Sequence, residues 1–360
     1  MAEKLLMKGN EALAESAIIA GCHHYFAYPI TPQNEIPAYM ARRMPQVGGT
    51  FIQAESEIAA INMVFGAAAA GARAMTSSSS PGISLKQEGI SYLSGAGLPA
   101  VVVNIMRGGP GLGNISGSQA DYFQATRGGG HGDYRTIVLA PASVQEMANL
   151  TIEAFDLADE YRIVVMILGD GFLGQISEPL ILPNPSGKSF DKASWALTGA
   201  VGREPHLVMS LRLTPEEALE KVNLALQEKY RVITERERRF ETYHGDDADY
   251  LLVGFGTSAR ICKGAVNTLR RSNIKAGLFR PISLWPFPYE ELKAASRRVK
   301  KLLVVEMNSG QMLEDIRLAL YASEDAASSP SSAQIDFYGK MGGTVPQIEE
   351  IIERVVSYEK

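Results

Sequence analysis

Three polar side chains that could take part in catalysis follow the end of an expected strand, at the start of a helix or a glycine turn. Thr31, Glu57 and Arg107 each follow a short apolar stretch of the chain. Parallel α/β sheets bind ligands in a crevice beside the carboxyl ends of their strands, so we expect these three side chains to face that crevice. A hydroxyl and a guanidinium there could hold a bound carboxylate, and a carboxyl group could move a proton.

Glu57 is the residue on which the functional hypothesis depends. It ends the run Gln-Ala-Glu-Ser-Glu at 53–57, and acids in the first turn of a helix are favoured by the helix dipole alone. The helix that follows consists mostly of Ala, Gly and Ile and should be buried, where a carboxylate needs a partner. The aminopyrimidine of thiamine diphosphate is one such partner, because a carboxyl group at its N1′ favours the imino tautomer that activates the cofactor.

Thr31 and Arg107 each have a structural explanation beside the functional one. Thr31 precedes Pro32, and the pair suits the N-cap and first position of a helix. Its hydroxyl could at the same time hydrogen-bond a bound carboxylate. Arg107 opens the glycine-rich turn 108–111, where its guanidinium could grip a carboxylate with two parallel hydrogen bonds or form an interdomain ion pair.

Two polar segments could line the same crevice. Four consecutive serines follow Thr76, and we expect their hydroxyls mainly to cap the next helix, with some contribution to a pocket. Residues 111–133 form a long segment with Gln119, Asp121 and a glycine run, which is typical of a lid or a binding loop.

Two glycine turns resemble cofactor motifs but fit them incompletely. Gly169-Asp170-Gly171 matches the start of a thiamine diphosphate magnesium motif, but the later asparagine is missing where 195–198 read Trp-Ala-Leu-Thr, so Asp170 is expected to be a turn residue. The turn 254–259 reads Gly-x-Gly-x-x-Ala, as in dinucleotide sites. The next strand ends at Arg280 without an acid for a ribose, which leaves NADP as a weaker alternative to a tight strand–helix turn.

The elements that must position these residues alternate between apolar strands and helices up to residue 182, which predicts a doubly wound parallel sheet. Strands are expected at 25–28, 50–53, 74–78, 100–106, 137–140 and 163–168, and helices at 10–20, 32–42, 55–72, 84–95 and 144–161. Pro37 should kink or divide the second helix.

The rest of the chain predicts a linker and a second domain. Residues 183–247 read as a linker with a charged helix over 214–240, which Thr214 and Pro215 would begin. Residues 248–360 read as a smaller α/β domain with strands at 250–254, 275–279, 301–306 and 335–338 and a last helix at 345–356.

Composition narrows the classes of protein. The 360 residues have a net charge of −5, which argues against a nucleic-acid surface. No apolar run approaches bilayer length and the first residues lack the apolar core of a signal peptide, so a cytoplasmic protein without a membrane segment is expected. The two cysteines, Cys22 and Cys262, cannot ligate an iron–sulfur cluster, and the five histidines show no metal-ligand spacing.

Taken together, the motifs resemble the alpha subunits of 2-oxoacid:ferredoxin oxidoreductases. The segments that carry this resemblance, in order, are 28–32, 53–60, 107–111, 130–134 and, in the second domain, 304–311. Within the family, the serine-rich stretch 75–92 is most similar to 2-oxoisovalerate (3-methyl-2-oxobutanoate) ferredoxin oxidoreductases. The resemblance implies a pyrimidine-binding thiamine diphosphate domain followed by a transketolase C-terminal-like domain.

The resemblance also implies roles for particular residues. Glu57 would hold the aminopyrimidine N1′ with Pro29 beside that ring, and Thr31 and Arg107 would bind the 2-oxoacid carboxylate. The implied reaction is oxidative decarboxylation of a 2-oxoacid, branched-chain by the nearest likeness, to acyl-CoA and CO2 with reduction of ferredoxin.

Several partners follow from the same resemblance. A beta subunit would hold the pyrophosphate, Mg2+ and an iron–sulfur cluster, while a gamma subunit, a ferredoxin-like subunit and external ferredoxin would complete the system, with coenzyme A as co-substrate. Two rival hypotheses are an NADP-linked oxidoreductase that uses the turn 254–259 and a transketolase-like scaffold without chemistry.

Overall fold

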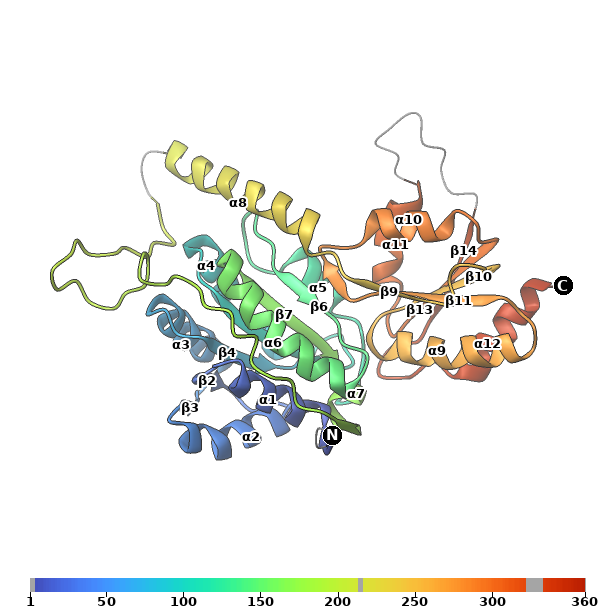
Figure 1. The fold of residues 1–360 in the computed structure, drawn as a ribbon, viewed down its shortest axis with the longest axis horizontal. Helices are drawn as coiled ribbons and strands as arrows, with labels where there is room; N and C mark the ends of the chain where they lie inside the picture. Colours follow the sequence, from blue (N-terminus) through green and yellow to red (C-terminus); the bar gives the residue numbers. More distant parts are fainter. Residues whose placement is uncertain (1–3, 213–215, 322–332, 360) are drawn as a thin grey trace.

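The structure, a computed structural model, describes residues 4–212, 216–321 and 333–359. Within these ranges the chain forms two large β-sheets side by side, each covered by helices on both faces (Figure 1). The long helix α8 (Glu216–Arg236) lies beside the larger sheet. No helix in the described ranges is long and apolar enough to cross a lipid bilayer.

The larger sheet, as far as the structure describes the chain, has seven strands in the order β12-β6-β7-β5-β4-β2-β3. All neighbouring pairs are parallel except β12 with β6. The strands are β2 (His24–Ala27), β3 (Thr50–Gln53), β4 (Ala74–Ser78), β5 (Ala100–Met106), β6 (Ile137–Leu139), β7 (Val164–Asp170) and β12 (Ser283–Trp285). The central β5 and β7 are buried along their whole lengths, as expected of strands covered on both faces. The predicted doubly wound sheet is confirmed.

Separate sets of helices cover the two faces of this sheet. On one face, α3 (Glu57–Ala69) and α4 (Pro81–Ala96) pack on strand residues such as Val102. On the other, α1 (Gly9–Ile19), α2 (Glu35–Arg43) and α6 (Val144–Tyr161) pack on the alternate residues, such as Val101. Alternate residues of β5 therefore face the two separate sets of helices.

The smaller sheet, within the described ranges, has five strands in the order β14-β13-β10-β11-β9, parallel except for β9. Its strands are β9 (Phe240–Tyr243), β10 (Tyr250–Val253), β11 (Ala276–Pro281), β13 (Lys301–Glu306) and β14 (Gln334–Gly339). Its helices are α9 (Gly256–Arg271), α10 (Tyr289–Ser296), α11 (Gln311–Tyr321) and α12 (Ile348–Val356).

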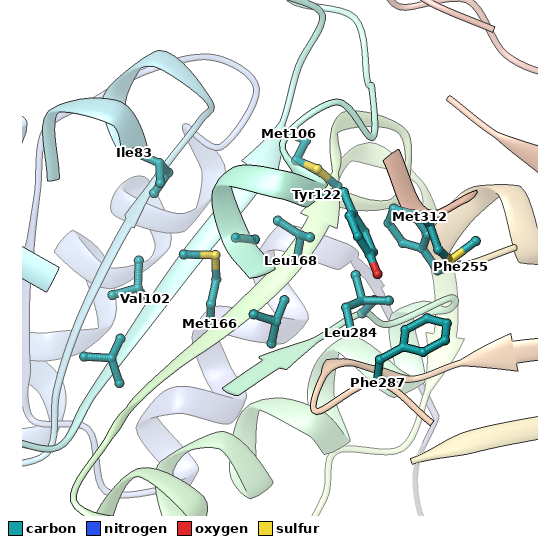
Figure 2. Packing of buried hydrophobic residues seen from close by; sticks show 14 of the residues in the cluster. Ile83, Val102, Met106, Tyr122, Met166, Leu168, Phe255, Leu284, Phe287 and Met312 are labelled. Carbon is teal, nitrogen blue, oxygen red and sulfur yellow. The ribbon is translucent and has the colours of Figure 1, made fainter. Parts of the chain in front are cut away.

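One apolar cluster joins the two sheets into a continuous core. Figure 2 shows it running from Ile83 and Val102 through Tyr122 to Phe255 and Met312 of the second sheet's helices and loops. Tyr122 begins the short helix α5 (Tyr122–Arg127), which lies inside the long segment 111–133. That segment thus helps to hold the two sheets together.

Several strands and connections were not predicted. β1 (Leu5–Lys8) pairs with β8 (Ser177–Leu180), and α7 (Gly171–Gln175) links β7 to that pair. β9 lies in the predicted linker but joins the smaller sheet. β12 lies in the predicted second domain but joins the larger sheet. Both strands therefore cross the predicted divisions at 182 and 247. The short helices η1 (Met44–Val47) and η2 (Ser357–Glu359) complete the described elements. The cap predicted at Thr214 and Pro215 lies outside the described residues.

Three helices of the larger sheet begin two or three residues from the predicted start, and α12, predicted to begin at 345, begins at Ile348. The helix predicted at Pro32 begins at Glu35, so Thr31 is not its N-cap. Pro37 lies in the first turn of this helix, where no intrahelical hydrogen bond needs its missing N–H. The proline therefore does not divide the helix. The helix predicted at 55 begins at Glu57, because Ser56 is extended and its hydroxyl caps the helix. The helix predicted at 84 begins at Pro81, the favoured proline position.

Candidate active site

The carboxyl ends of four neighbouring strands, β5, β4, β2 and β3, place the candidate residues at one edge of the larger sheet. Thr31 follows β2, Glu57 follows β3 and Arg107 follows β5. The serine run that ends β4 lies between them in the sheet order. The topology therefore gathers residues that are far apart in the sequence, as predicted from the strand–helix junctions.

Glu57 is the first residue of α3, and Ser56 caps the helix by accepting a hydrogen bond from the Ala59 amide at 3.2 Å. Glu57 is only 6% exposed. Its carboxylate lies against the start of α4, since a Cβ added at Gly82 would meet its Oε1 at 2.6 Å. The positive end of α4 favours a negative charge there. Among the described residues, no hydrogen bond or ion pair within 4.0 Å ends on this carboxylate.

Lys86 is a functional candidate that the sequence reasoning missed. It is fully buried in α4, and its Nζ donates a hydrogen bond to the backbone carbonyl of Glu57 at 3.4 Å. Burial lowers the pKa of Lys86 to about 8, against the opposing effect of the nearby Glu57 charge. A lysine between Leu85 and Gln87 in an expected helix gives no signal of burial, which is why the prediction overlooked it.

Arg107 and Thr31 are in direct contact, through the Thr31 backbone. The Arg107 Nη1 donates to the Thr31 carbonyl at 3.0 Å, and Nη2 donates to the Leu112 carbonyl at 2.8 Å. The Arg107 Nε is buried without a partner. The Thr31 hydroxyl accepts a hydrogen bond from Asn34 at 3.0 Å. An unpaired buried guanidinium N–H is costly in a native fold and typical of a site that a ligand completes.

The serine run connects Arg107 to Glu57. Ser80 accepts a hydrogen bond from the Arg107 amide at 3.0 Å, and its hydroxyl lies 2.6 Å from Asp121. Two residues further along the chain, Gly82 contacts Glu57. Ser80 has a φ of 30°, a strained conformation that clusters at functional sites.

The prediction that these hydroxyls mainly cap a helix is wrong. Ser80 occupies the N-cap position of α4 but makes no side-chain cap hydrogen bond. Ser79 instead donates to the Ile105 carbonyl at 2.7 Å, and Ser77 donates to Gln33 at 2.5 Å. The hydroxyls of Thr76 and Ser78 are buried without a partner. The run therefore builds the inner wall of the site.

Pro29 is exposed on the loop between β2 and α2, two residues before Thr31. A groove of about 490 Å3 borders the Arg107 end of the site. Its lining residues are Ser80, Pro81, Ser84, Gly108, Gly109, Pro110, Gly111, Leu112 and Asp121. Burial raises the pKa of Asp121, against hydrogen bonds from Ser80 and Asn104 that lower it.

The segment 111–133, predicted to be a lid or binding loop, docks onto the second sheet. Gln119 is fully buried, and its Nε2 donates to the Phe255 carbonyl at 2.7 Å. Its Oε1 accepts from Ser258 at 2.7 Å and from the Met307 amide at 3.1 Å. Its own carbonyl accepts from Asn308 at 2.8 Å. This part of the segment is a joint between the two sheets.

The two glycine turns belong to the same joint. Asp170 caps α7, as expected of a turn residue, and also accepts a hydrogen bond from the Thr257 hydroxyl at 2.9 Å. Thr257 lies in the turn 254–259, so this turn contacts the protein itself. Arg280, considered above for a 2′-phosphate, is paired with Glu146 at 2.7 Å and Glu241 at 2.8 Å. These contacts support the interpretation as a tight strand–helix turn.

Comparison with known proteins agrees with this architecture. Residues 15–221 match the family described as pyruvate flavodoxin/ferredoxin oxidoreductase, thiamine diphosphate-binding, and residues 248–351 match core domain II of pyruvate:ferredoxin oxidoreductase. Among solved structures, 2-oxoglutarate:ferredoxin oxidoreductase from Magnetococcus marinus, with 2-oxoglutarate, coenzyme A and succinyl-CoA bound, is similar with a TM-score of 0.88 and 26% identity. That match covers all of this chain and 66% of the longer one. A split-gene transketolase shares the fold, with a TM-score of 0.59 and 13% identity.

Curated relatives match along nearly the whole chain. The ketoisovalerate oxidoreductase subunit VorB of Methanothermobacter marburgensis is 50% identical over 350 residues, which are 97% of this chain and 96% of that protein. The 2-oxoglutarate synthase subunit KorA of Methanothermobacter thermautotrophicus is 34% identical over 386 residues and the full length of both. With a family model over more than half of its length and relatives of this identity, the chain belongs to the 2-oxoacid:ferredoxin oxidoreductases, as an alpha-type subunit with a thiamine diphosphate-binding domain.

Proposed function

We propose that this chain supplies the pyrimidine-binding half of a thiamine diphosphate site. The observation that carries the proposal is the Glu57 carboxylate, which is buried at the mouth of the sheet and has no hydrogen-bond partner among the described residues. Within the described ranges the Glu57 carboxylate lacks a protein partner and keeps some solvent access although its residue is largely buried, so an aminopyrimidine N1′ could reach it and supply the missing hydrogen bond. The residues present thus fit the pyrimidine half of the cofactor.

Each candidate residue has a distinct role in this proposal. When bound, thiamine diphosphate supplies the nucleophilic carbon that attacks the ketone of the 2-oxoacid. Glu57 holds the pyrimidine N1′ and exchanges a proton with it, and Pro29 packs beside the ring. Arg107 and Thr31 bind the substrate carboxylate, with the unpaired Arg107 Nε as one available donor.

The substrate is, in our proposal, a branched-chain 2-oxoacid. The relatives named for ketoisovalerate are 49–50% identical, whereas the relatives named for 2-oxoglutarate are 30–39% identical. The reaction joins the acyl group to coenzyme A, releases CO2 and passes two electrons, one at a time, to ferredoxin. The neighbour with coenzyme A and succinyl-CoA bound supports this choice of co-substrate.

The remaining parts of the enzyme belong to other chains. We assign the pyrophosphate, Mg2+ and an iron–sulfur cluster to a beta subunit, with a gamma subunit, a ferredoxin-like subunit and external ferredoxin completing electron transfer in the cytoplasm. The two cysteines support the assignment of the iron–sulfur cluster to another chain. Both are buried, one in an apolar cluster of the larger sheet and the other in an apolar cluster of the smaller sheet. A cluster bound by four thiolates needs more ligands than this chain can offer.

The test is Glu57→Gln in the assembled complex, assayed by dye reduction with a panel of 2-oxoacids. Loss of this proton-transfer group should lower turnover on the order of a hundredfold or more. Glu55→Gln is the matched control, because Glu55 is exposed in the same acidic run. Unchanged turnover in the Glu57 variant would remove the proposed role, and a preference of the parent complex for 2-oxoglutarate would remove the proposed substrate.

A further inference from the structure

Lys86 occupies an unusual position for a lysine. Its side chain is fully buried, and among the described residues it makes a single hydrogen bond, to the Glu57 carbonyl at 3.4 Å. Removing an ammonium from water is costly unless an opposite charge lies nearby. The nearby Glu57 charge offsets part of this cost, although burial still lowers the pKa of Lys86 to about 8.

The packing of α3 against α4 explains how Lys86 reaches this place. Gly82, Lys86 and Gly89 lie at i, i+4 and i+7 on one face of α4 and meet Glu57 and Ile61 of α3. A Cβ at Gly89 would lie 2.5 Å from the Ile61 side chain, and one at Gly82 would lie 2.6 Å from Glu57 Oε1. The two glycines therefore allow the close approach that encloses the lysine.

The stability of the helices does not account for a lysine here. Its ammonium lies at the first turn of α3, where the helix dipole disfavours a positive charge. Burial disfavours the charge as well, so an apolar residue of similar length would stabilise this helix pair at least as well. The Glu57 carboxylate is the nearby group that favours a cation at this point.

We propose that Lys86 is a positioning residue for Glu57. Its hydrogen bond holds the first turn of α3, and its charge attracts the Glu57 carboxylate and holds it in place for an aminopyrimidine. This inference rests on the proposed cofactor role of Glu57. It predicts that Lys86 affects cofactor binding through Glu57 without touching the cofactor.

The experiment measures the dissociation constant for thiamine diphosphate in the assembled complex, with Mg2+ present, by isothermal titration calorimetry. Lys86→Met should weaken binding about tenfold or more, because it leaves the Glu57 charge uncompensated. Lys229→Met is the matched control. Lys229 also donates to a backbone carbonyl, that of Arg162 at 3.1 Å, and burial also lowers its pKa to about 8, but it lies on α8. This control should leave cofactor affinity unchanged.

A double-variant comparison separates positioning from a general loss of structure. Glu57→Gln should weaken binding strongly in the parent chain and much less in the Lys86→Met background, because the lysine acts through the carboxylate. Lys86→Gln, which is neutral and still polar, repeats the comparison should Lys86→Met fail to assemble.

The possible results are distinguishable. If Glu57→Gln leaves the affinity unchanged, the cofactor role of Glu57 falls and Lys86 falls with it. If Glu57→Gln weakens binding but Lys86→Met and Lys86→Gln do not, or if the effects at the two positions multiply independently, only the role of Lys86 is overturned.

Discussion

Buried polar groups are common in two regions of the molecule. One is the mouth of the larger sheet, formed by Thr31, Glu57, Arg107 and the serine run, and the other is the joint between the two sheets. The two regions differ in how many of these groups have hydrogen-bond partners. At the joint, both side-chain polar atoms of Gln119 have partners, and Asp315 accepts from Tyr122, Tyr289 and Arg127. At the mouth, the hydroxyl of Ser78 and the Nε of Arg107 have none.

This difference separates structural polar groups from functional ones. A native fold rarely leaves buried polar atoms unpaired, so a concentration of them marks a surface that another molecule completes. Changes at the mouth should therefore alter ligand binding with little effect on stability, and changes at the joint should do the reverse.

The largest effect is expected from Gly82→Ala at the mouth. The added Cβ would lie 2.0 Å from Ser78 Oγ and 2.6 Å from Glu57 Oε1, so the carboxylate must move. A displacement of about 1 Å in a catalytic group can cost on the order of a hundredfold in turnover. Steady-state assays of the complex measure this loss.

Gly66→Ala is the control for helix effects. Gly66 lies in α3 with nothing within 4 Å of an added Cβ, so alanine there should leave turnover unchanged and slightly stabilise the helix. Equal turnover in the two variants would contradict the placement of Glu57 against α4.

Arg107→Lys should have the next largest effect. Lysine keeps the charge but loses the planar fork and the unpaired Nε, so the KM for the 2-oxoacid should rise about tenfold to a hundredfold. Cofactor affinity should not change, because Arg107 is assigned to the substrate. Arg271→Lys, at an exposed position of α9, is the control. A rise in the cofactor dissociation constant without a rise in KM would reverse this assignment.

The two regions also differ in how far the sequence could predict them. Strands β3, β4 and β5 and helix α6 have the predicted bounds, because apolar runs and amphipathic periods are local signals. The gathering of Thr31, Glu57 and Arg107 at one edge was also predictable, since parallel strands align their carboxyl ends.

What escaped prediction depends on contacts between distant parts of the chain. β9 and β12 are short strands that add antiparallel to sheets formed by other segments, so no local period marks them. Gln119 docks on the second sheet through partners more than a hundred residues away. Lys86 is buried where two glycines of α4 allow a close approach to α3.

At the joint, Glu306 should make stability depend on pH. Burial raises its pKa from 4.5 to about 7, although hydrogen bonds from the Met312 amide, Asn308 and the Leu313 amide lower it. Between these values the folded state holds a proton that the unfolded state releases. This contribution therefore favours folding at low pH and is lost as the pH rises through that window.

Glu306→Gln tests this pH dependence. The parent chain should lose about 3 kcal/mol of unfolding free energy between about pH 4.5 and pH 7 relative to this variant. Urea unfolding across the window measures the difference between the two chains, which cancels the similar contributions of Asp121 and Asp170. Parallel pH profiles for both chains would show that Glu306 does not titrate as described.

The smallest effect is expected from Tyr122→Phe, also at the joint. The Tyr122 hydroxyl donates to Asp315 at 2.6 Å, and Asp315 keeps its partners Tyr289 and Arg127 when that hydroxyl is lost. Loss of one buried hydrogen bond to a charged acceptor should cost about 1–3 kcal/mol and lower the melting temperature by a few degrees. The KM and cofactor affinity should not change, because the ring remains packed against Phe255.

Tyr92→Phe supplies the comparison that makes this last result informative. The Tyr92 hydroxyl also donates to a carboxylate, Glu88 at 2.6 Å, but on the exposed surface of α4, where water replaces the lost partner. Thermal unfolding should separate the two variants, with a clear loss for Tyr122→Phe and almost none for Tyr92→Phe. If Tyr122→Phe instead weakened substrate or cofactor binding without affecting stability, the joint would be part of the binding site, and the division between the two regions would fail.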